Sequence, residues 1–355
     1  MILETRGTSY AIPVDIPDLQ FFHSASSFHL ETGEQLHDLT IAYHTYGQMN
    51  ARKDNVIWVF HALTANSHVT DWWAGLFGEG ALFDPSKQFI VCANILGSCY
   101  GSTCARSINP LTNEAYGLDF PLVTIRDIVR AHDLLRAHLG IEQIALGVGG
   151  SCGGHQALEY AAIFPERMEK MALLVTSARE SAWAIAIHEA GRMSLQADPS
   201  FWDNTDEAGE EGLRGARAVG LLGYRTYDAY IETQTDSDQE KLKDFRASSY
   251  IQYQGDKLKR RFYAHCYWHL LRSLDTHNLS RGRGSMEEVL SQIKTPALLI
   301  GIDSDMLIPP SQQRFLAQHL PQGEYREISS RFGHDGFLIE CEQIDKLIKE
   351  WLRHS

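Results

Sequence analysis

The feature that most constrains this chain is a single serine set among glycines at the end of an apolar run. Residues 144–160 read Ile-Ala-Leu-Gly-Val-Gly-Gly-Ser-Cys-Gly-Gly-His-Gln-Ala-Leu-Glu-Tyr. Gly149, Ser151 and Gly153 fit the G-x-S-x-G nucleophile elbow, a tight strand-to-helix turn that exposes the serine oxygen above a sheet. The serine backbone is strained in such a turn, so the residues two before and two after it must be small. The pattern predicts either a nucleophilic Ser151 or a glycine-rich β–α turn with an incidental serine.

Apolar runs on both sides of this turn predict further strands. They lie at 55–60, 88–94, 170–176, 295–301 and 324–329. Helical patterns alternate with them; one begins at an N-cap in Thr124-Ile-Arg-Asp127 and ends at Gly140. Strand and helix in alternation indicate a mostly parallel sheet flanked by helices. Residues 26–47 alternate apolar and polar around a turn at 31–34, which predicts a two-stranded hairpin at the sheet edge.

The alternation of strand and helix stops in the second half of the chain. Residues 182–293 show helical periodicity with charges and aromatic residues, and no strand is predicted there. We therefore expect a core formed by residues 1–181 and 294–355, with a helical insertion at 182–293. An insertion above an active site commonly acts as a lid.

Charge and cysteine content exclude several classes of partner. The 355 residues carry 32 Lys and Arg against 45 Asp and Glu, a net charge of −13, which argues against nucleic acid. Residues 1–10 lack the apolar core of a signal peptide, and no apolar run is long enough for a membrane span, so we expect a cytoplasmic protein without membrane contact. The cysteines show neither paired zinc spacing nor disulfide density, which predicts free thiols and no metal: Cys92, Cys99, Cys104, Cys152, Cys266 and Cys341.

A nucleophilic serine needs a base, and the base needs a carboxylate that holds its tautomer. Asp303 and Asp305 both follow the strand at 295–301, and His334 follows the last strand. This is the serine, acid, histidine order of the α/β-hydrolase fold. The order of these residues and their positions in loops after strands favour a catalytic His334 that is paired with one of the two aspartates. The alternatives are a helix-capping role for each aspartate and a structural role for the histidine.

Two backbone amides are candidates for an oxyanion hole. Cys152 opens the helix after Ser151, so its N–H is free to face a negative acyl oxygen. Leu63 lies in His61-Ala-Leu-Thr64, directly after the strand at 55–60, where the second donor is expected. For His61 itself the pattern favours a structural role.

Several longer motifs accompany these residues. They are His61–Thr64, Asn94–Thr103, Asp119–Asp127, Gly149–Gly154, Gly301–Pro310, Gly333–Phe337 and, in the insertion, Gly212–Tyr224 and Tyr253–Phe262. Together they resemble the homoserine O-acetyltransferases of the α/β-hydrolase type over nearly the whole chain. The resemblance implies Ser151, Asp305 and His334 as the triad, and the amides of Leu63 and Cys152 as the oxyanion hole.

The resemblance also implies substrates and further site residues. Arg217 and Tyr224 would reach from the lid to the amino-acid substrate, and the guanidinium of Arg217 would bind the substrate carboxylate. Asp335 would pair with the substrate ammonium. The implied activity is acetyl transfer from acetyl-CoA to the L-homoserine hydroxyl through a serine acyl-enzyme, in methionine biosynthesis. No tightly bound cofactor is implied. The expected assembly is a homodimer formed through the lid.

The chain departs from the family pattern near the expected acyl site. Cys104-Ala105 stands where many relatives have Gly-Pro, Cys152 and His155 stand where methionines are common, and Tyr263 lies in an altered lid motif. These departures leave open a succinyl donor or a serine acceptor. The same residues are also compatible with a serine esterase, in which water is the acceptor, and with a noncatalytic binding protein on this fold.

Overall fold

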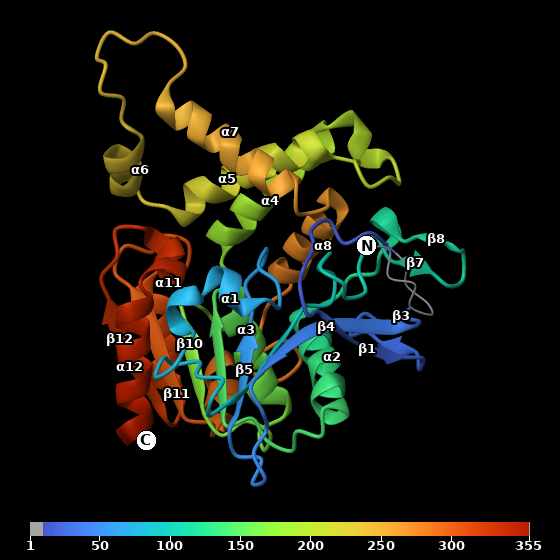
Figure 1. The fold of residues 1–355 in the computed structure, drawn as a ribbon, viewed down its shortest axis with the longest axis vertical. Helices are drawn as coiled ribbons and strands as arrows, with labels where there is room; N and C mark the ends of the chain where they lie inside the picture. The colour runs from blue at the N-terminus through green and yellow to red at the C-terminus, as the bar shows by residue number, and fades with distance from the viewer. Residues whose placement is uncertain (1–9, 355) are drawn as a thin grey trace.

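The computed structural model describes residues 10–354 and is built around one eight-stranded sheet (Figure 1). In spatial order the strands are β1 (Gln20–Ser24), β4 (Leu39–Tyr46), β6 (Phe89–Ala93), β5 (Val56–Phe60), β9 (Leu146–Gly150), β10 (Met171–Leu174), β11 (Ala297–Ile302) and β12 (Gly323–Ile328). From β6 to β12 all pairs are parallel, whereas β4 and β1 run antiparallel to their neighbours. The predicted, mostly parallel α/β sheet is confirmed. The prediction about the N-terminus concerns mainly residues 1–9, which lie outside the described residues.

The central strands are buried on both faces because helices cover both. Along β5, Val56, Trp58 and Phe60 join one apolar cluster, and Ile57 and Val59 join another on the opposite face. The first cluster is shared with α2 (Ile125–His138), α3 (Cys152–Ile163) and α10 (Pro310–His319), and the second with η1 (Ala74–Leu76) and α12 (Cys341–His354). The shorter elements of the core are α1 (Val69–Trp72), β7 (Ile108–Asn109), β8 (Glu114–Ala115), η2 (Gly117–Asp119), α9 (Met286–Gln292), η4 (Gly333–Asp335) and α11 (Gly336–Ile339). Alternate side chains thus anchor the sheet in two separate cores.

The predicted start of α2 is confirmed in detail. The side chain of Thr124 accepts a hydrogen bond from the amide of Asp127, and the Asp127 carboxylate accepts one from the amide of Thr124. This capping box satisfies two donors that the first turn of a helix leaves free. The helix ends at His138 with Leu139 as its C-cap. Gly140, the next residue, has a positive φ of 66°.

The prediction for residues 26–47 is only partly right. A hairpin does form around the turn at 31–34, but it consists of the short strands β2 (Phe28–His29) and β3 (Gln35–Leu36) and makes a separate two-stranded sheet. The rest of the segment becomes β4, which lies inside the large sheet. The edge of the sheet at this end is β1, which pairs with β4 on the side away from β6.

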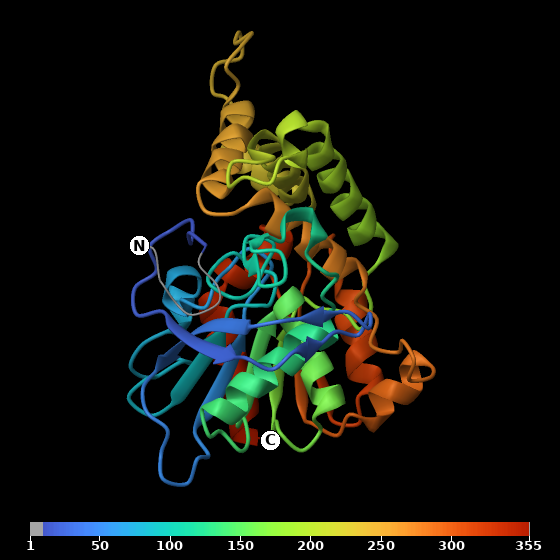
Figure 2. The same ribbon diagram turned by 90° about the vertical axis from the view of Figure 1, so that its right-hand side faces the viewer.

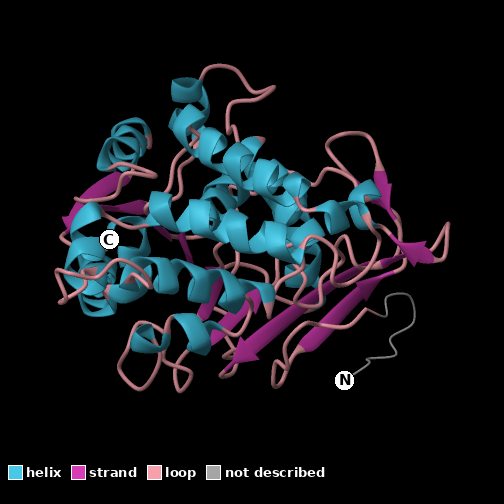
Figure 3. Cartoon of the chain, turned by 90° about the horizontal axis from the view of Figure 1, so that it is seen from above, coloured by secondary structure: helices cyan, strands magenta, loops and turns pink. Residues whose placement is uncertain are grey.

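The segment between β10 and β11 is helical and contains no strand (Figures 1 and 2). Its helices, other than α9, are α4 (Ala182–Ala197), η3 (Pro199–Trp202), α5 (Glu210–Tyr224), α6 (Tyr227–Gln234), α7 (Arg246–Lys259) and α8 (Ala264–Asp275). From above, they lie across the end of the sheet (Figure 3). The two ends of the segment meet: Arg179 and Asn278 form an antiparallel bridge, and the Glu180 amide donates to the carbonyl of His277 at 2.9 Å.

Candidate active site

Ser151 occupies a strained turn between β9 and α3. Its φ is 56° and its ψ is −125°, a backbone conformation that residues other than glycine rarely adopt. The two flanking glycines of the motif are required by space: a Cβ on Gly149 would lie 2.3 Å from the carbonyl oxygen of Gly153, and a Cβ on Gly153 would lie 2.0 Å from that of Phe60. The turn therefore closes only with small residues at both places, as the sequence indicates.

The structure brings Ser151, His334 and Asp305 into one hydrogen-bonded chain. His334 Nε2 lies 2.8 Å from Ser151 Oγ, and His334 Nδ1 lies 2.7 Å from Asp305 Oδ2. The other oxygen of Asp305 accepts from the amides of Leu307 and Ile308 at 2.8 and 3.0 Å, which fixes the carboxylate. Nδ1–H therefore donates to Asp305, and Nε2 is left to accept the proton of the serine hydroxyl.

The neighbouring aspartate takes a different place. Asp303 accepts a hydrogen bond from the amide of Ser330 at 3.2 Å and makes no hydrogen bond to His334. Of the two carboxylates that spacing left open, the structure thus places Asp305 beside the histidine.

The charge of Asp305 determines the electrostatics of the histidine. Burial by itself lowers the pKa of His334, but the charge of Asp305 and the hydrogen bond to it raise the pKa by more. The net effect is a pKa above the usual value of 6.5. A base with this raised pKa is a stronger proton acceptor from the serine, and it must be deprotonated before the reaction starts.

Leu63 and Cys152 line the same cavity as Ser151. Within residues 10–354 neither amide has a hydrogen-bond acceptor, so both remain available to an oxyanion. The side chain of Gln156 donates to the carbonyls of His61 and Cys152, each at 3.1 Å, and so ties the two loops together. These hydrogen bonds hold the two segments at a fixed separation, which an oxyanion hole formed by the two amides would require.

His61 supports the loop that carries Leu63. Its Nε2 accepts from the amide of Ile95 at 3.0 Å, so the proton resides on Nδ1, which donates to the carbonyl of Ala62 at 2.8 Å. Burial lowers the pKa of His61 to about 4, and the ring is neutral near pH 7. These contacts agree with the structural role that the sequence favours.

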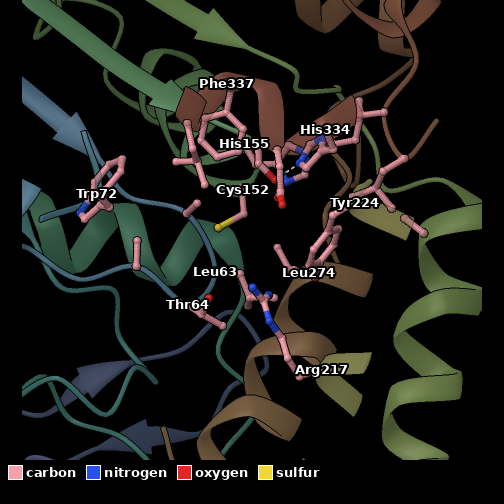
Figure 4. A pocket seen from close by; sticks show the side chains of 18 of the residues that line it. Leu63, Thr64, Trp72, Cys152, His155, Arg217, Tyr224, Leu274, His334 and Phe337 are labelled. Carbon is pink, nitrogen blue, oxygen red and sulfur yellow. Dashed lines mark hydrogen bonds between the residues drawn. The ribbon is translucent and has the colours of Figure 1, made fainter. Parts of the chain in front are cut away.

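A cavity of about 420 Å³ opens above Ser151 between the core and the helical segment (Figure 4). The lining residues are Ala62, Leu63, Thr64, Ala65, Asn66, Asp71, Trp72, Ser151, Cys152, His155, Glu180, Ala184, His188, Arg217, Tyr224, Lys257, Arg261, Leu274, Leu307, Ile308, His334, Asp335, Phe337 and Leu338. Every residue that the family resemblance implies for the site lines the cavity, except Asp305, which hydrogen-bonds to His334. Asp303, the other candidate for the acid, does not line it. The cavity is large enough for a small substrate beside part of a longer one.

Arg217 and Tyr224 reach the cavity from α5, and the Tyr224 ring lies beside that of His334, with 6.1 Å between the ring centres (Figure 4). The guanidinium of Arg217 lies 5.7 Å from the centre of the Tyr224 ring, and no carboxylate of the described residues pairs with it. Burial raises the pKa of Tyr224 well above 10, so its hydroxyl stays protonated. Asp335 differs from Arg217 in being paired, since its carboxylate accepts from Arg225 Nε at 2.9 Å.

Sequence reasoning did not nominate several polar residues of this wall. Glu180, His188 and Arg261 are buried or half-buried residues of the cavity. Arg261 donates to the carbonyl of Thr64 and the hydroxyl of Tyr100, both at 2.6 Å, and so braces the loop that bears Leu63. Arg261 did lie in a recognised motif, but no local pattern marks the other two.

Residues 10–354 show little that would fit a metal site, a membrane span or a disulfide. This part of the chain contains no group of three or more His, Cys, Asp or Glu side chains placed to hold a metal ion. None of its helices has the length and apolar character needed to cross a bilayer. All six cysteines are free thiols.

Comparison with known proteins agrees with this geometry. Residues 55–340 match the family model described as alpha/beta hydrolase fold, so the chain belongs to that family of proteins. Within it, the homoserine O-acetyltransferase of Cyclobacterium marinum is 46% identical over 332 residues, which are 94% of each protein. The chain therefore belongs to the homoserine O-acetyltransferase family of acyltransferases.

Solved structures support the same fold. The homoserine O-acetyltransferase of Bacillus anthracis superposes with a TM-score of 0.88 at 24% identity, over 96% of this chain and 98% of that one. A protein described as esterase E22 superposes with a TM-score of 0.86 at 22% identity, over 94% of this chain and 99% of the other. The same fold thus occurs in a transferase and an esterase, so the fold alone does not choose the acceptor.

Proposed function

We propose that this protein transfers an acetyl group from acetyl-CoA to the hydroxyl of L-homoserine, a step of methionine biosynthesis. The observation that carries the proposal is the chain of hydrogen bonds from Asp305 through His334 to Ser151. Arg217, which has no carboxylate partner among residues 10–354, lines the cavity above it. Membership of the homoserine O-acetyltransferase family supports the choice of donor and acceptor.

In the first half-reaction Ser151 takes the acetyl group. His334 Nε2 removes the hydroxyl proton as Ser151 Oγ forms a bond to the thioester carbon. The amides of Leu63 and Cys152 stabilise the oxyanion of the tetrahedral intermediate. When the intermediate collapses, the carbon–sulfur bond breaks and the proton on His334 passes to the departing thiolate. Free coenzyme A and an acetyl-serine are the products.

In the second half-reaction homoserine accepts the acetyl group. Arg217 binds its carboxylate, Asp335 lies near its ammonium, and His334 removes the proton of its hydroxyl. The hydroxyl oxygen attacks the acetyl-serine carbon, and the bond to Ser151 Oγ breaks. The proton returns through His334 to Ser151, and O-acetylhomoserine leaves.

Water competes with homoserine for the acetyl-serine. We assign to the helical segment at 182–293 the role of a lid that excludes water and positions the incoming hydroxyl. Its contacts with the histidine loop support this role: Arg225 pairs with Asp335, and Thr226 Oγ1 donates to the carbonyl of Arg331.

Replacement of Ser151 by alanine tests the scheme. We expect acetyl-CoA-dependent acetylation of homoserine to fall by about 10⁴-fold or more, because no acyl-enzyme can form. Mass spectrometry of the wild-type protein mixed with acetyl-CoA alone should detect the acetyl-serine, and the variant should lack it. Retained turnover in Ser151→Ala would contradict the mechanism.

The donor and acceptor are tested by the release of free coenzyme A. Acetyl-CoA and succinyl-CoA are each supplied with homoserine, with serine and with neither. We expect fast release only with acetyl-CoA and homoserine. Release that is independent of any amino acid would instead indicate a hydrolase, and preference for succinyl-CoA or serine would keep the mechanism and change the substrate.

We further propose a homodimer that forms through the lid and works in the cytoplasm. Exposed apolar side chains gather on α5, α6 and α7 and in the turn before α7, and they support the dimer: Leu222, Tyr227, Ile231, Leu242, Phe245 and Tyr253. The six free cysteines support a reducing compartment. Light scattering of the purified protein would measure the assembly, and a monomer at micromolar concentration would contradict it.

A further inference from the structure

The turn that joins α5 to α6 lies against the loop that carries the catalytic histidine. Arg225 is the C-cap of α5 and Thr226 is the N-cap of α6, so the two helices follow each other without a linker. Residues 329–335, which lead from β12 to α11, form the histidine loop. In Figure 1 the turn lies above this part of the chain, which is drawn in red. The lid therefore reaches the histidine loop with a short segment of fixed geometry.

The two backbones approach each other closely at Gly333, the residue before His334. A Cβ on Gly333 would lie 2.9 Å from the carbonyl oxygen of Tyr224 and 3.2 Å from Cγ2 of Thr226. Gly333 also has a positive φ of 63°, a conformation that a side chain would strain. Space and conformation both require a glycine here, so the lid packs directly on the backbone of the histidine loop.

Polar contacts hold the histidine loop from the lid on both sides of the base. Before His334, Thr226 Oγ1 donates its only proton to the carbonyl of Arg331, and the same oxygen accepts an amide hydrogen bond as the cap of α6. After His334, the carboxylate of Asp335 accepts from Arg225 Nε at 2.9 Å. The start of α6 and the end of α5 are thus both tied to the loop.

The ion pair between Arg225 and Asp335 is partly shielded from water. Their side chains are 26% and 15% exposed, and the guanidinium also lies 5.5 Å from the centre of the Tyr250 ring on α7. By contrast, Arg331 of the same loop pairs with Glu232 on α6, and both of these side chains are more than half exposed. A shielded charge pair holds its geometry, whereas an exposed pair contributes little.

The position of the base depends on anchors from both parts of the molecule. On the core side, the amide of Gly333 donates to Ser304 Oγ at 3.2 Å. On the lid side, Arg225 is the one charged partner of Asp335 among residues 10–354. His334 lies between these anchors, and catalytic geometry must be held to within about 0.5 Å. A loose anchor at either end would lengthen the 2.8 Å distance from Nε2 of His334 to the nucleophilic oxygen.

We propose that Arg225 is a positioning residue, which couples the docking of the lid to the assembly of the triad. By holding Asp335 it holds His334 within reach of Ser151, although Arg225 itself does not line the cavity. The inference rests on the proposed function, in which His334 is the base of both half-reactions. The lid thus acts on the chemistry of the serine as well as on the access of water. A role of this kind predicts a loss in acylation, which involves no amino acid.

Acylation of Ser151 by p-nitrophenyl acetate tests this role without an acceptor. The burst of p-nitrophenol measures the rate constant of acylation and the KM for the ester separately. Arg225→Met keeps the length of the side chain and removes every donor. We expect its rate constant to fall by about 30-fold and its KM to stay within about threefold, because the base is displaced and the ester site is intact. In Arg225→Lys the ammonium restores a partner for Asp335, so a rate within about threefold of wild type is expected.

Glu232→Gln is the matched control, because it breaks the exposed ion pair between α6 and the same loop. Its acylation rate should stay within about threefold of wild type. Unchanged acylation in Arg225→Met, a loss in Arg225→Lys as large as that in Arg225→Met, or an equal loss in Glu232→Gln would overturn the proposal. A wild-type protein that gives no burst, or that transfers acetyl to homoserine no faster than to water, would instead count against the proposed function.

Discussion

The two walls of the cavity differ in how their polar groups are satisfied. On the wall from the core, Ser151, His334 and Asp305 bond to one another and need no ligand to hold their geometry. On the wall bordered by the helical segment, Arg217 has no carboxylate partner among residues 10–354. A preorganised triad can acylate and deacylate with many acceptors, whereas unpaired charges discriminate between acceptors. We infer that the core supplies the chemistry and that the opposite wall chooses the acceptor.

The largest effect is expected from a change in the core wall, Asp305→Asn. Loss of the negative charge should reduce kcat by about 10³-fold or more, since the amide no longer stabilises the cation or the correct tautomer of His334. The neutral form of His334 is the active one, so the wild-type rate of acylation falls as the pH drops through its raised pKa, above 6.5. This fall in rate is the acid limb of the pH profile. In the variant it should move to lower pH, because His334 has lost the charge that raises its pKa. The pH profile of coenzyme A release measures both effects.

Asp303→Asn is the matched control for that experiment. Asp303 contacts the amide of Ser330 and makes no hydrogen bond to the histidine. Activity within about tenfold of wild type is expected, together with an unchanged acid limb. A shifted limb in Asp303→Asn, or an unshifted one in Asp305→Asn, would contradict the assignment of the carboxylate.

A smaller and more selective effect is expected on the opposite wall from Arg217→Ala. Loss of a two-pronged partner for the substrate carboxylate should raise KM for homoserine by about 100-fold. Acetylation of Ser151 by p-nitrophenyl acetate should remain near the wild-type rate. Such a separation of the two half-reactions would sharpen the contrast between the walls, and a matching loss in both would remove it.

Arg214→Ala is the control on the same helix. Arg214 pairs with Glu211 and Asp256 and does not line the cavity. Such pairs near the surface contribute about 0–1 kcal/mol, so stability and KM should change little. An increase of KM equal to that of Arg217→Ala would show that α5 itself, rather than one guanidinium, sets the affinity.

The smallest effect is expected from Cys152→Ala. The scheme uses the backbone amide of this residue, which the variant keeps, so turnover should change by less than about threefold. Burial raises the pKa of the Cys152 thiol to about 12, which excludes the thiolate as a nucleophile near pH 7. A loss of activity beyond about 100-fold, at unchanged thermal stability, would mean that the side chain takes part.

The sequence predicts the core wall better than the opposite one because its signals are local or ordered along the chain. The glycines around Ser151 follow from the space that the turn allows, and the order of serine, acid and histidine follows from the succession of strands. The spacing alone did not decide between Asp303 and Asp305. That choice depends on how the loop after β11 folds over, which places one carboxylate toward His334.

The residues that sequence reasoning missed are those whose role depends on three-dimensional pairing. Glu180 is a buried carboxylate without a Lys or Arg partner among residues 10–354, and the ring of His188 lies against Asp275. The prediction of the sheet edge was wrong for the same reason, because β1 is placed there by its pairing with β4 and not by a local pattern. In β1 both faces remain partly exposed, from Gln20 to Ser24, so no apolar alternation identifies it as a strand.

The bridge between Arg179 and Asn278 brings together the two points at which the chain enters and leaves the helical segment. Its two ends leave and rejoin the core side by side, so its length can change with only a slowly growing entropic cost of loop closure. A laboratory could exchange residues 180–277 between relatives as one cassette and leave the strands of the sheet untouched. Evolution has the same route to a new acceptor, through recombination at two neighbouring positions of the fold.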